Sequence, residues 1–267
     1  MFVERYREAI ELSGAGWTEA SLADVFLEFD PLQSFEERFR FWLEARPAAM
    51  ISTFGAFREP EEDALRVAGV LNVATASTLR EAKVARAARV DAIVVQGAEA
   101  GGPRWSSVDT GAAAVGLMSL LPHVKRATGL PLIAAGGIVT PEQVRAAKVL
   151  GADACLVGSA FLTTEEARAD GFYQWAATES SPADYVYGPF EGTTDGWYLR
   201  NDFVSGLAKE MACADRPPAG LFEPWTAQLR KRLMAKGEGA AVALSFGQAA
   251  GRVPYVRVAD VVRSLSA

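Results

Sequence analysis

The feature of this sequence that most constrains its fold is a regular alternation of two kinds of segment between residues 49 and 170. Short runs rich in apolar and β-branched residues stand at residues 49–54, 70–74, 92–96, 132–135 and 154–157. Segments of helical periodicity separate these runs, at residues 60–67, 79–89, 113–128 and 141–150. This order is typical of βαβ units, and nearly continuous apolar runs are typical of strands covered on both faces. We therefore predict an α/β fold with five parallel strands.

The parts of the chain before and after this alternation have a different character. Helical spacing at residues 1–12 and 34–43 predicts a helical N-terminal segment. After about residue 170 the sequence becomes rich in Pro, Gly and aromatic residues, and helical spacing then returns at residues 224–236, 238–250 and 256–265. We therefore predict three parts: the N-terminal segment at 1–48, a partial βα barrel with the ligand loops at 49–170, and an irregular and helical C-terminal lobe at 171–267.

Composition and charge exclude several classes of function. The chain has 27 Lys and Arg residues against 33 Asp and Glu residues, a net charge of −6, and half of its residues are apolar. This mixture is typical of a globular protein with a sizeable core, and the acidic balance argues against binding to nucleic acid or to an anionic membrane. The first ten residues include Glu4, Arg5, Arg7 and Glu8, so they predict no secretory signal, and we expect a cytoplasmic protein.

The sequence offers no metal motif and no familiar nucleophile. Cys155 and Cys213 lie far apart without CxxC or Cys/His spacing, so we predict neither a disulfide nor a metal site. Walker, GxSxG and HExxH sequences are also absent, which leaves phosphoryl transfer by a P-loop, α/β-hydrolase chemistry and zincin-type proteolysis without support. The single histidine, His123, lies far from the predicted ligand loops, and we expect it to be exposed.

Glycine-bearing segments follow three successive predicted strands, at residues 96–102, 135–138 and 157–160. The loops at the carboxyl ends of parallel strands form the ligand face of such a sheet. Gly136 and Gly137 precede a helix start at Thr140, and Gly158 and Ser159 follow the next strand, a pattern that matches the phosphate grip of a βα barrel. The alternative is that these glycines only form turns; their repetition at consecutive strand ends favours a ligand site.

Three of these segments carry a resemblance to a known family. The stretches DAIVVQGAEAGG (91–102), PLIAAGGI (131–138) and LGADACLVGSAFL (150–162) resemble the nitronate monooxygenases, formerly called 2-nitropropane dioxygenases. The likeness continues at residues 35–55 and in the tail at 245–253. These enzymes are FMN-dependent TIM-type βα barrels related to the FMN-dependent enoyl-ACP reductases. The resemblance therefore implies an FMN-binding barrel over most of the chain.

The resemblance also implies roles for particular residues. The residues expected to hold the FMN phosphate are Gly136, Gly137, Gly158 and Ser159. Those expected beside the isoalloxazine are Gln96 and Gly97, and those expected in the loop over the ribityl or substrate side are Glu99, Ala100, Gly101 and Gly102. Candidates on the substrate side are Pro103, Arg104 and Trp105, of which Arg104 would face an anionic substrate. Glu99 has two alternative roles: a base if it is desolvated, or a residue that pins its own loop.

Two departures from the family pattern affect the interpretation. Family members with a catalytic base carry His directly after Ala-Gly-Gly, where this chain has Pro103, so no catalytic residue is assigned. In addition, the resemblance implies that the sequence begins in the connection after the family's third strand, so we expect strands one to three to be lacking. A barrel closes with eight strands. We expect the open edges to be covered by an upstream piece, by a partner chain or second copy, or by residues 1–45.

These observations lead to a functional expectation with two alternatives. The leading hypothesis is an FMN-dependent oxidoreductase that oxidises a small nitronate-like anion with O₂ and needs no protein base, because the substrate is already deprotonated. The first alternative is an NAD(P)H-dependent flavin reductase of the enoyl-ACP reductase type. The second is a non-catalytic or truncated relative that needs a partner to complete the barrel.

Overall fold

The computed structural model describes residues 35–53, 55–104, 106, 114–169, 171–188, 195–201, 204–205, 243–251 and 256–266. The described residues fall into two compact units. The first, called the sheet unit, comprises those within Gln33–Ala100, Arg104–Phe161 and Val258–Ala267. The second, called the lobe, comprises those within Gly101–Pro103 and Leu162–Arg257.

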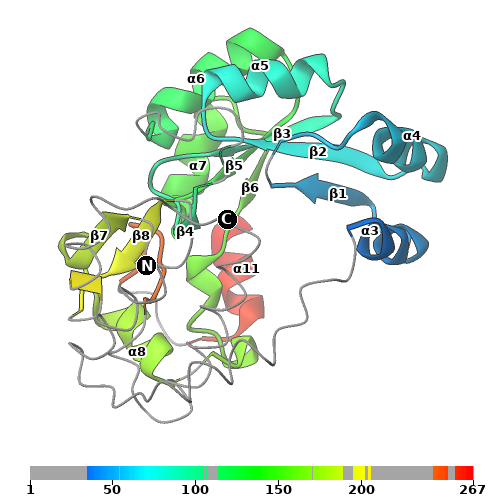
Figure 1. Cartoon of the computed structure of the whole chain (residues 1–267). Helices are drawn as coiled ribbons and strands as arrows, with labels where there is room; N and C mark the ends of the chain where they lie inside the picture. Colours follow the sequence, from blue (N-terminus) through cyan, green and yellow to red (C-terminus); the bar gives the residue numbers. More distant parts are fainter. Residues whose placement is uncertain are drawn as a thin grey trace, which may run out of the picture. The chain divides into compact units, whose positions relative to one another are not determined.

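A five-stranded parallel sheet forms the centre of the sheet unit (Figure 1). Its strands are β1 (Ala49–Ser52), β2 (Leu71–Ala76), β3 (Ala92–Gln96), β5 (Leu132–Ala135) and β6 (Ala154–Leu156). They pair in the order β1-β2-β3-β5-β6, and every neighbouring pair is parallel. The five strands predicted from the apolar runs are therefore confirmed, with bounds that differ by at most a few residues.

Helices connect these strands, as expected of βαβ units. The connecting helices are α4 (Glu59–Ala68), α5 (Leu79–Ala87), α6 (Leu117–Thr128) and α7 (Pro141–Val149). In addition, α3 (Phe35–Glu44) precedes β1, and α11 (Val258–Ser266) is the last described helix of the chain. The helix start predicted at Thr140 is confirmed, because the Thr140 hydroxyl and the Gln143 side chain form a reciprocal capping box. Thr78 and Glu81 form the same device at the start of α5.

The apolar core lies on both faces of the sheet because side chains of a strand alternate between its faces. On the face covered by helices, Ile93, Val95 and Leu132 pack with Leu121 of α6 in one large buried cluster. On the other face, Val73, Val94 and Ala135 form a smaller buried cluster. Burial on two faces explains why the strand sequences are continuously apolar rather than alternating.

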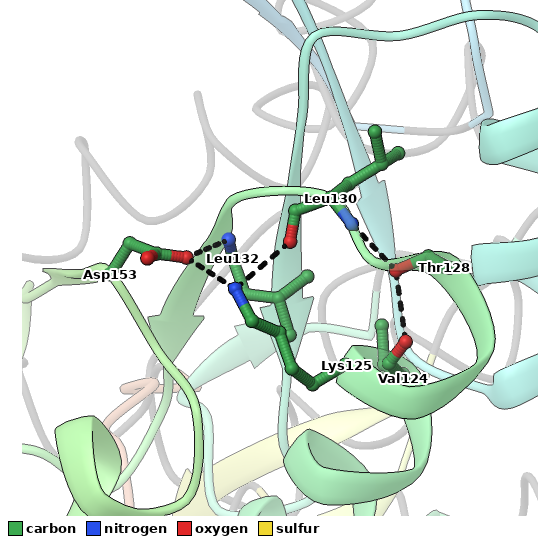
Figure 2. A network of polar contacts seen from close by, with 6 residues as sticks. All are labelled: Val124, Lys125, Thr128, Leu130, Leu132 and Asp153. Carbon is green, nitrogen blue, oxygen red and sulfur yellow. Dashed lines mark hydrogen bonds and ion pairs between the residues drawn. The ribbon is translucent and has the colours of Figure 1, made fainter.

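At the amino ends of two strand pairs, an aspartate directly before one strand accepts a hydrogen bond from the neighbouring strand. Asp91 precedes β3 and accepts a hydrogen bond from the Asn72 backbone N–H of β2 at 2.7 Å. Asp153 precedes β6 and accepts one from the Leu132 backbone N–H of β5 at 2.8 Å. Lys125 of α6 donates to the same Asp153 oxygen at 2.9 Å and to the Leu130 carbonyl at 3.2 Å (Figure 2). Lys125 thus links α6 to the amino ends of β5 and β6.

We expect Asp153→Ala to lower the free energy of unfolding by about 1 kcal/mol near neutral pH, since it removes a charge-assisted hydrogen bond. The Leu132 N–H and the Lys125 ammonium hold the pKa of Asp153 below its ordinary value. A lowered folded-state pKa gives stability that is full above the pKa of an unfolded aspartate, about 3.9, and is lost as the pH falls through the lowered value. Urea unfolding of both proteins at several pH values measures the difference.

Asp260→Ala is the matched control, because Asp260 forms an exposed pair with Arg263 one turn away on α11. We expect it to change the unfolding free energy by less than about 0.5 kcal/mol at any pH. A difference between wild type and Asp153→Ala that persisted unchanged in acid would contradict the electrostatic explanation.

The lobe contains a small antiparallel sheet that sequence reasoning did not predict. Its strands are β4 (Gly102–Pro103), β7 (Tyr185–Gly188) and β8 (Gly196–Leu199), in the order β4-β8-β7. A helix, α8 (Gly171–Glu179), lies between β4 and β7 along the chain. Two short 3₁₀ turns, Glu165–Ala167 and Pro182–Asp184, complete the described backbone elements of the lobe.

The helix predicted at residues 238–250 is wrong over its described part. Residues 243–250 run in extended and turn conformations instead, with Ser245 bridging to Tyr198 of β8. The Leu199 N–H donates to the Leu244 carbonyl at 2.8 Å, and Phe246 is buried against Tyr173. The backbone of this segment forms its hydrogen bonds with β8 and not within a helix. A tertiary contact therefore outweighs the helical spacing of the local sequence. The helices predicted at 1–12 and 224–236 lie outside the described residues.

Candidate functional site

The carboxyl ends of β2, β3, β5 and β6 form one edge of the parallel sheet, called here the ligand edge. Gln96 pairs with Ala135, and Ala135 pairs with Leu156 in the sheet register. The residues that follow these positions therefore come together at this edge: Gly97 after β3, Gly136 and Gly137 after β5, and Gly158 after β6. The fold thus brings the three glycine-bearing segments to neighbouring corners, as the sequence predicts.

Gly136 and Gly137 are required by the packing of the sheet unit itself. Both have positive φ, 101° and 68°, which side chains rarely adopt. A Cβ on Gly136 would lie 2.8 Å from the Ala100 backbone N, and one on Gly137 would lie 2.8 Å from the Glu99 Cβ. The turn alternative therefore explains why these two positions are glycine.

Gly158 differs from them, because packing does not explain it. Its backbone lies outside the left-handed region, it is exposed, and no described atom lies within 4 Å of the place where a Cβ would stand. The following residue, Ser159, starts a short 3₁₀ turn, Ser159–Phe161. Gly158 thus leaves open space at the corner next to Gly136 and Gly137.

Glu99 pins its own loop to the start of α6. Its two carboxylate oxygens lie 3.0 and 2.9 Å from the Leu117 backbone N–H, which donates to them. This N–H is one of the donors that a helix leaves unsatisfied at its N-terminus, so the carboxylate is favourable there. A Cβ on Gly97 would lie 2.3 Å from one of these oxygens. Of the two roles that the sequence leaves open for Glu99, the structure shows the loop-pinning one.

The predicted ligand loop divides at its end between the two units. Residues 97–100 belong to the sheet unit, whereas Gly101, Gly102 and Pro103 belong to the lobe. In the lobe, Gly101 forms a bridge to Trp197, and Pro103 of β4 pairs with Gly196 of β8. Strand β4 lies at the edge of the described antiparallel sheet. An edge strand tolerates proline because its missing N–H is not needed for pairing. Trp105 lies outside the described residues.

A buried polar cluster at the carboxyl end of β2 escaped sequence reasoning. It consists of Ser77, Thr78, Glu81, Arg104 and Ser106. The Glu81 carboxylate, 4% exposed as a residue, accepts from the Ser77 backbone N–H at 2.8 Å and from the Ser106 hydroxyl at 2.6 Å. The signal available in the sequence was the Thr-x-x-Glu capping box directly after a predicted strand.

Other polar residues of the sequence analysis have simpler environments. His123 is exposed on α6, as predicted, with its Nδ1 atom 2.8 Å from the Ser119 carbonyl. Cys155 is half-buried, and burial raises the pKa of its thiol. Within the described residues, no group of three or more His, Cys, Asp or Glu side chains could hold a metal ion. No described helix combines the length and apolarity needed to span a membrane.

Comparison with known proteins identifies relatives of this chain. Residues 5–267 match the family described as nitronate monooxygenase. A probable nitronate monooxygenase of Bacillus subtilis is 41% identical over 132 residues, 48% of this chain and 38% of that protein. One of Staphylococcus haemolyticus is 28% identical over 239 residues, 88% of this chain and 64% of that protein. The chain thus spans less than two thirds of the length of these curated relatives.

Solved structures give the same result for the fold. A nitroalkane oxidase from Streptomyces ansochromogenes superposes with a TM-score of 0.81 at 29% identity, covering 97% of this chain and 76% of that one. FabK from Thermotoga maritima superposes with a TM-score of 0.71 at 22% identity, covering 88% and 72%, which shows a shared fold. The predicted TIM-type βα fold is confirmed, with the described parallel strands forming a half-barrel. By its sequence match and its fold, this chain belongs to the nitronate monooxygenase family.

Proposed function

We propose that this chain is an FMN-dependent oxidoreductase that oxidises a small, nitronate-like anion with O₂. The observation that carries the proposal is the Gly158 corner, which is open, exposed and next to Gly136 and Gly137 in the sheet. Packing accounts for two of these glycines but not for the third, and a ligand that approaches the main chain supplies the missing reason.

The residues at this edge suit the parts of FMN. The N–H groups of Gly136, Gly137 and Gly158, with the Ser159 hydroxyl, would hold the phosphate, because glycine corners let main-chain N–H groups approach an anion closely. Gln96, buried at the end of β3, and Gly97 would lie beside the ring system. Bound FMN would supply the two-electron redox chemistry that protein side chains do not provide.

The protein groups then bind and orient rather than transfer protons. Pro103 has no group that accepts a proton, and the Glu99 carboxylate is engaged by the Leu117 N–H. We therefore assign neither residue as a base for abstraction of a carbon-bound proton. A substrate that is already a nitronate needs no such base, which is why we propose the anion rather than the neutral nitroalkane as substrate.

The experiment that tests the proposal is the absorbance spectrum of the purified protein, followed by FMN titration. We expect flavin bands, or uptake of added FMN, and O₂ consumption on addition of propyl-1-nitronate. A protein that shows no flavin bands and takes up no FMN would refute the proposal. Bleaching of the flavin by anaerobic NADPH, without reaction with the nitronate, would replace it with the reductase alternative.

A further inference from the structure

We propose that Arg104 binds the anionic group of the substrate, and that Ser77 and Glu81 are the positioning residues that hold it at the ligand edge. This inference deepens the proposed function and rests on it for the identity of the substrate. The observation behind it is the buried polar cluster at the carboxyl end of β2.

Glu81 is the centre of this cluster. One of its oxygens, Oε2, accepts from the Ser77 N–H at 2.8 Å, the Ser77 hydroxyl at 2.9 Å and the Thr78 N–H at 3.1 Å. The other, Oε1, accepts from the Ser106 hydroxyl at 2.6 Å. A buried carboxylate costs much free energy unless such donors surround it. The cluster therefore holds the segment after β2 firmly against Ser106, which lies 25 residues further along the chain.

The same cluster fixes Arg104 by its side chain and its backbone. The Arg104 Nε donates to the Ser77 hydroxyl oxygen at 3.3 Å, and this hydroxyl donates in turn to Glu81. The Ser106 N–H donates to the Arg104 carbonyl at 2.9 Å. A guanidinium held through Nε has its plane defined, so it loses little conformational entropy when it binds an anion.

The register of the sheet places Ser77, to which Arg104 donates a hydrogen bond, next to the predicted ring position. Ala76 pairs with Val95, so Ser77, which follows Ala76, lies at the level of Gln96. Along the ligand edge the order is therefore Ser77, Gln96, the Gly136 corner and the Gly158 corner, separated by strand spacings of about 4.8 Å. With the phosphate at the glycine corners and the ring beside Gln96, Arg104 stands on the side of the ring that faces away from the phosphate.

The chemistry of a guanidinium suits a nitronate. Its planar fork of N–H donors matches two oxygens on one atom, and such charge-assisted pairs are stronger than neutral hydrogen bonds. The chain as a whole carries a net charge of −6, so its general field repels anions. A positioned cation at the ligand edge offsets this repulsion for an anionic substrate.

Helix capping alone does not account for the cluster. As the capping-box residue of α5, Glu81 needs only its contacts with Thr78. The Ser106 hydroxyl and the bridge from Ser77 to Arg104 lie outside that motif. These additional contacts connect the capping box to the residue that follows Pro103, and this connection is what a positioning role requires.

The test uses nitrate, a planar anion that the flavin cannot oxidise, and propyl-1-nitronate. Nitrate binding is measured by calorimetry with and without FMN, and FMN binding is measured separately by absorbance. We expect Arg104→Gln to weaken nitrate binding and to raise KM for the nitronate by about tenfold or more, with kcat and FMN affinity within about twofold. We expect Arg104→Lys to give a nitrate affinity and a KM between those of wild type and Arg104→Gln, because lysine keeps the positive charge but lacks the planar pair of N–H donors.

Ser77→Ala tests positioning, because it removes the bridge to Arg104 and leaves the backbone contacts of Glu81 in place. We expect a rise in KM of roughly threefold to tenfold without a change in kcat. The thermal unfolding temperature should fall by only about 4 °C, because one of the hydrogen bonds to Glu81 is lost. Arg145→Gln is the control, because Arg145 is exposed on α7 and pairs only locally with Glu142 among the described ion pairs. It should change none of these values.

The outcomes separate this inference from the proposed function. Nitrate affinity and KM that stay unchanged in Arg104→Gln, in protein that binds FMN normally, would overturn the inference. Loss of FMN in Arg104→Gln would overturn it as well, since Arg104 would then belong to the cofactor site. Nitrate binding that depends on Arg104 in a protein without any affinity for FMN would support the anion site and refute the flavin proposal.

Discussion

Gly158→Asp is expected to abolish FMN binding and to leave the fold intact. A Cβ at this position meets no described atom within 4 Å, and Gly158 is exposed and has no unusual φ, so we expect the protein to accommodate a side chain there. The new carboxylate would stand where the phosphate is proposed to bind. At a separation of about 4 Å and an effective dielectric constant near 20, each pair of like charges costs about 4 kcal/mol, roughly a thousandfold in affinity.

The measurement is FMN titration by absorbance, together with thermal unfolding of the FMN-free protein. Gly158→Ala is the control for bulk, and we expect it to weaken FMN binding much less than Gly158→Asp, because it adds no charge. The FMN-free unfolding temperature should stay within about 2 °C of wild type in both variants. Equal FMN affinities in wild type and Gly158→Asp would show that the phosphate binds elsewhere.

Gly136→Ala is expected to lower the free energy of unfolding by about 3 kcal/mol or more, from backbone strain and a steric clash together. A φ of 101° lies beyond the region that alanine adopts readily. The added Cβ would also lie 2.8 Å from both the backbone N and the Cβ of Ala100. Relief of this clash requires movement of the loop that Glu99 pins to α6.

Gly69→Ala is the matched control, because Gly69 also has a positive φ, 69°, but has no described atom within 4 Å of the Cβ position. It ends α4 in the left-handed conformation. We expect a loss of about 1 kcal/mol there, the usual cost of alanine at such a helix end. Urea unfolding of the three FMN-free proteins measures both values, and equal losses would contradict the clash with Ala100.

Sequence reasoning succeeded where the physical signal is local or periodic. The strands at residues 92–96 and 132–135 are found at the predicted bounds, because their apolar side chains are buried on both faces of the sheet. Thr140 and Gln143 predict the start of α7, because their capping box depends only on residues that are close in sequence. The glycine-bearing segments follow the strands, so their common edge also follows from the parallel topology.

It failed where a residue's environment comes from a distant part of the chain. The helical spacing at 238–250 has a local signal, but pairing of Ser245 with Tyr198 makes the described part extended. Lys125 keeps a partly exposed helical position, but its ion pair is with Asp153, 28 residues further along the chain, and no local pattern predicts that pair. The roles of the FMN-binding residues stay predictions, since they depend on a ligand.

The sequence by itself determined the parallel α/β architecture of the sheet unit, the order of the strands and helices in that unit, and the family to which the chain belongs. Apolar periodicity, helix caps and glycine-bearing motifs depend on residues that are close in sequence, and these signals are sufficient to predict the architecture and the family. Only the tertiary structure decided that Glu99 pins a loop, that Gly136 is required by packing while Gly158 is not, and that Glu81, Ser77 and Arg104 meet at one edge. Such contacts join residues far apart along the chain, and only folding sets the distances between them.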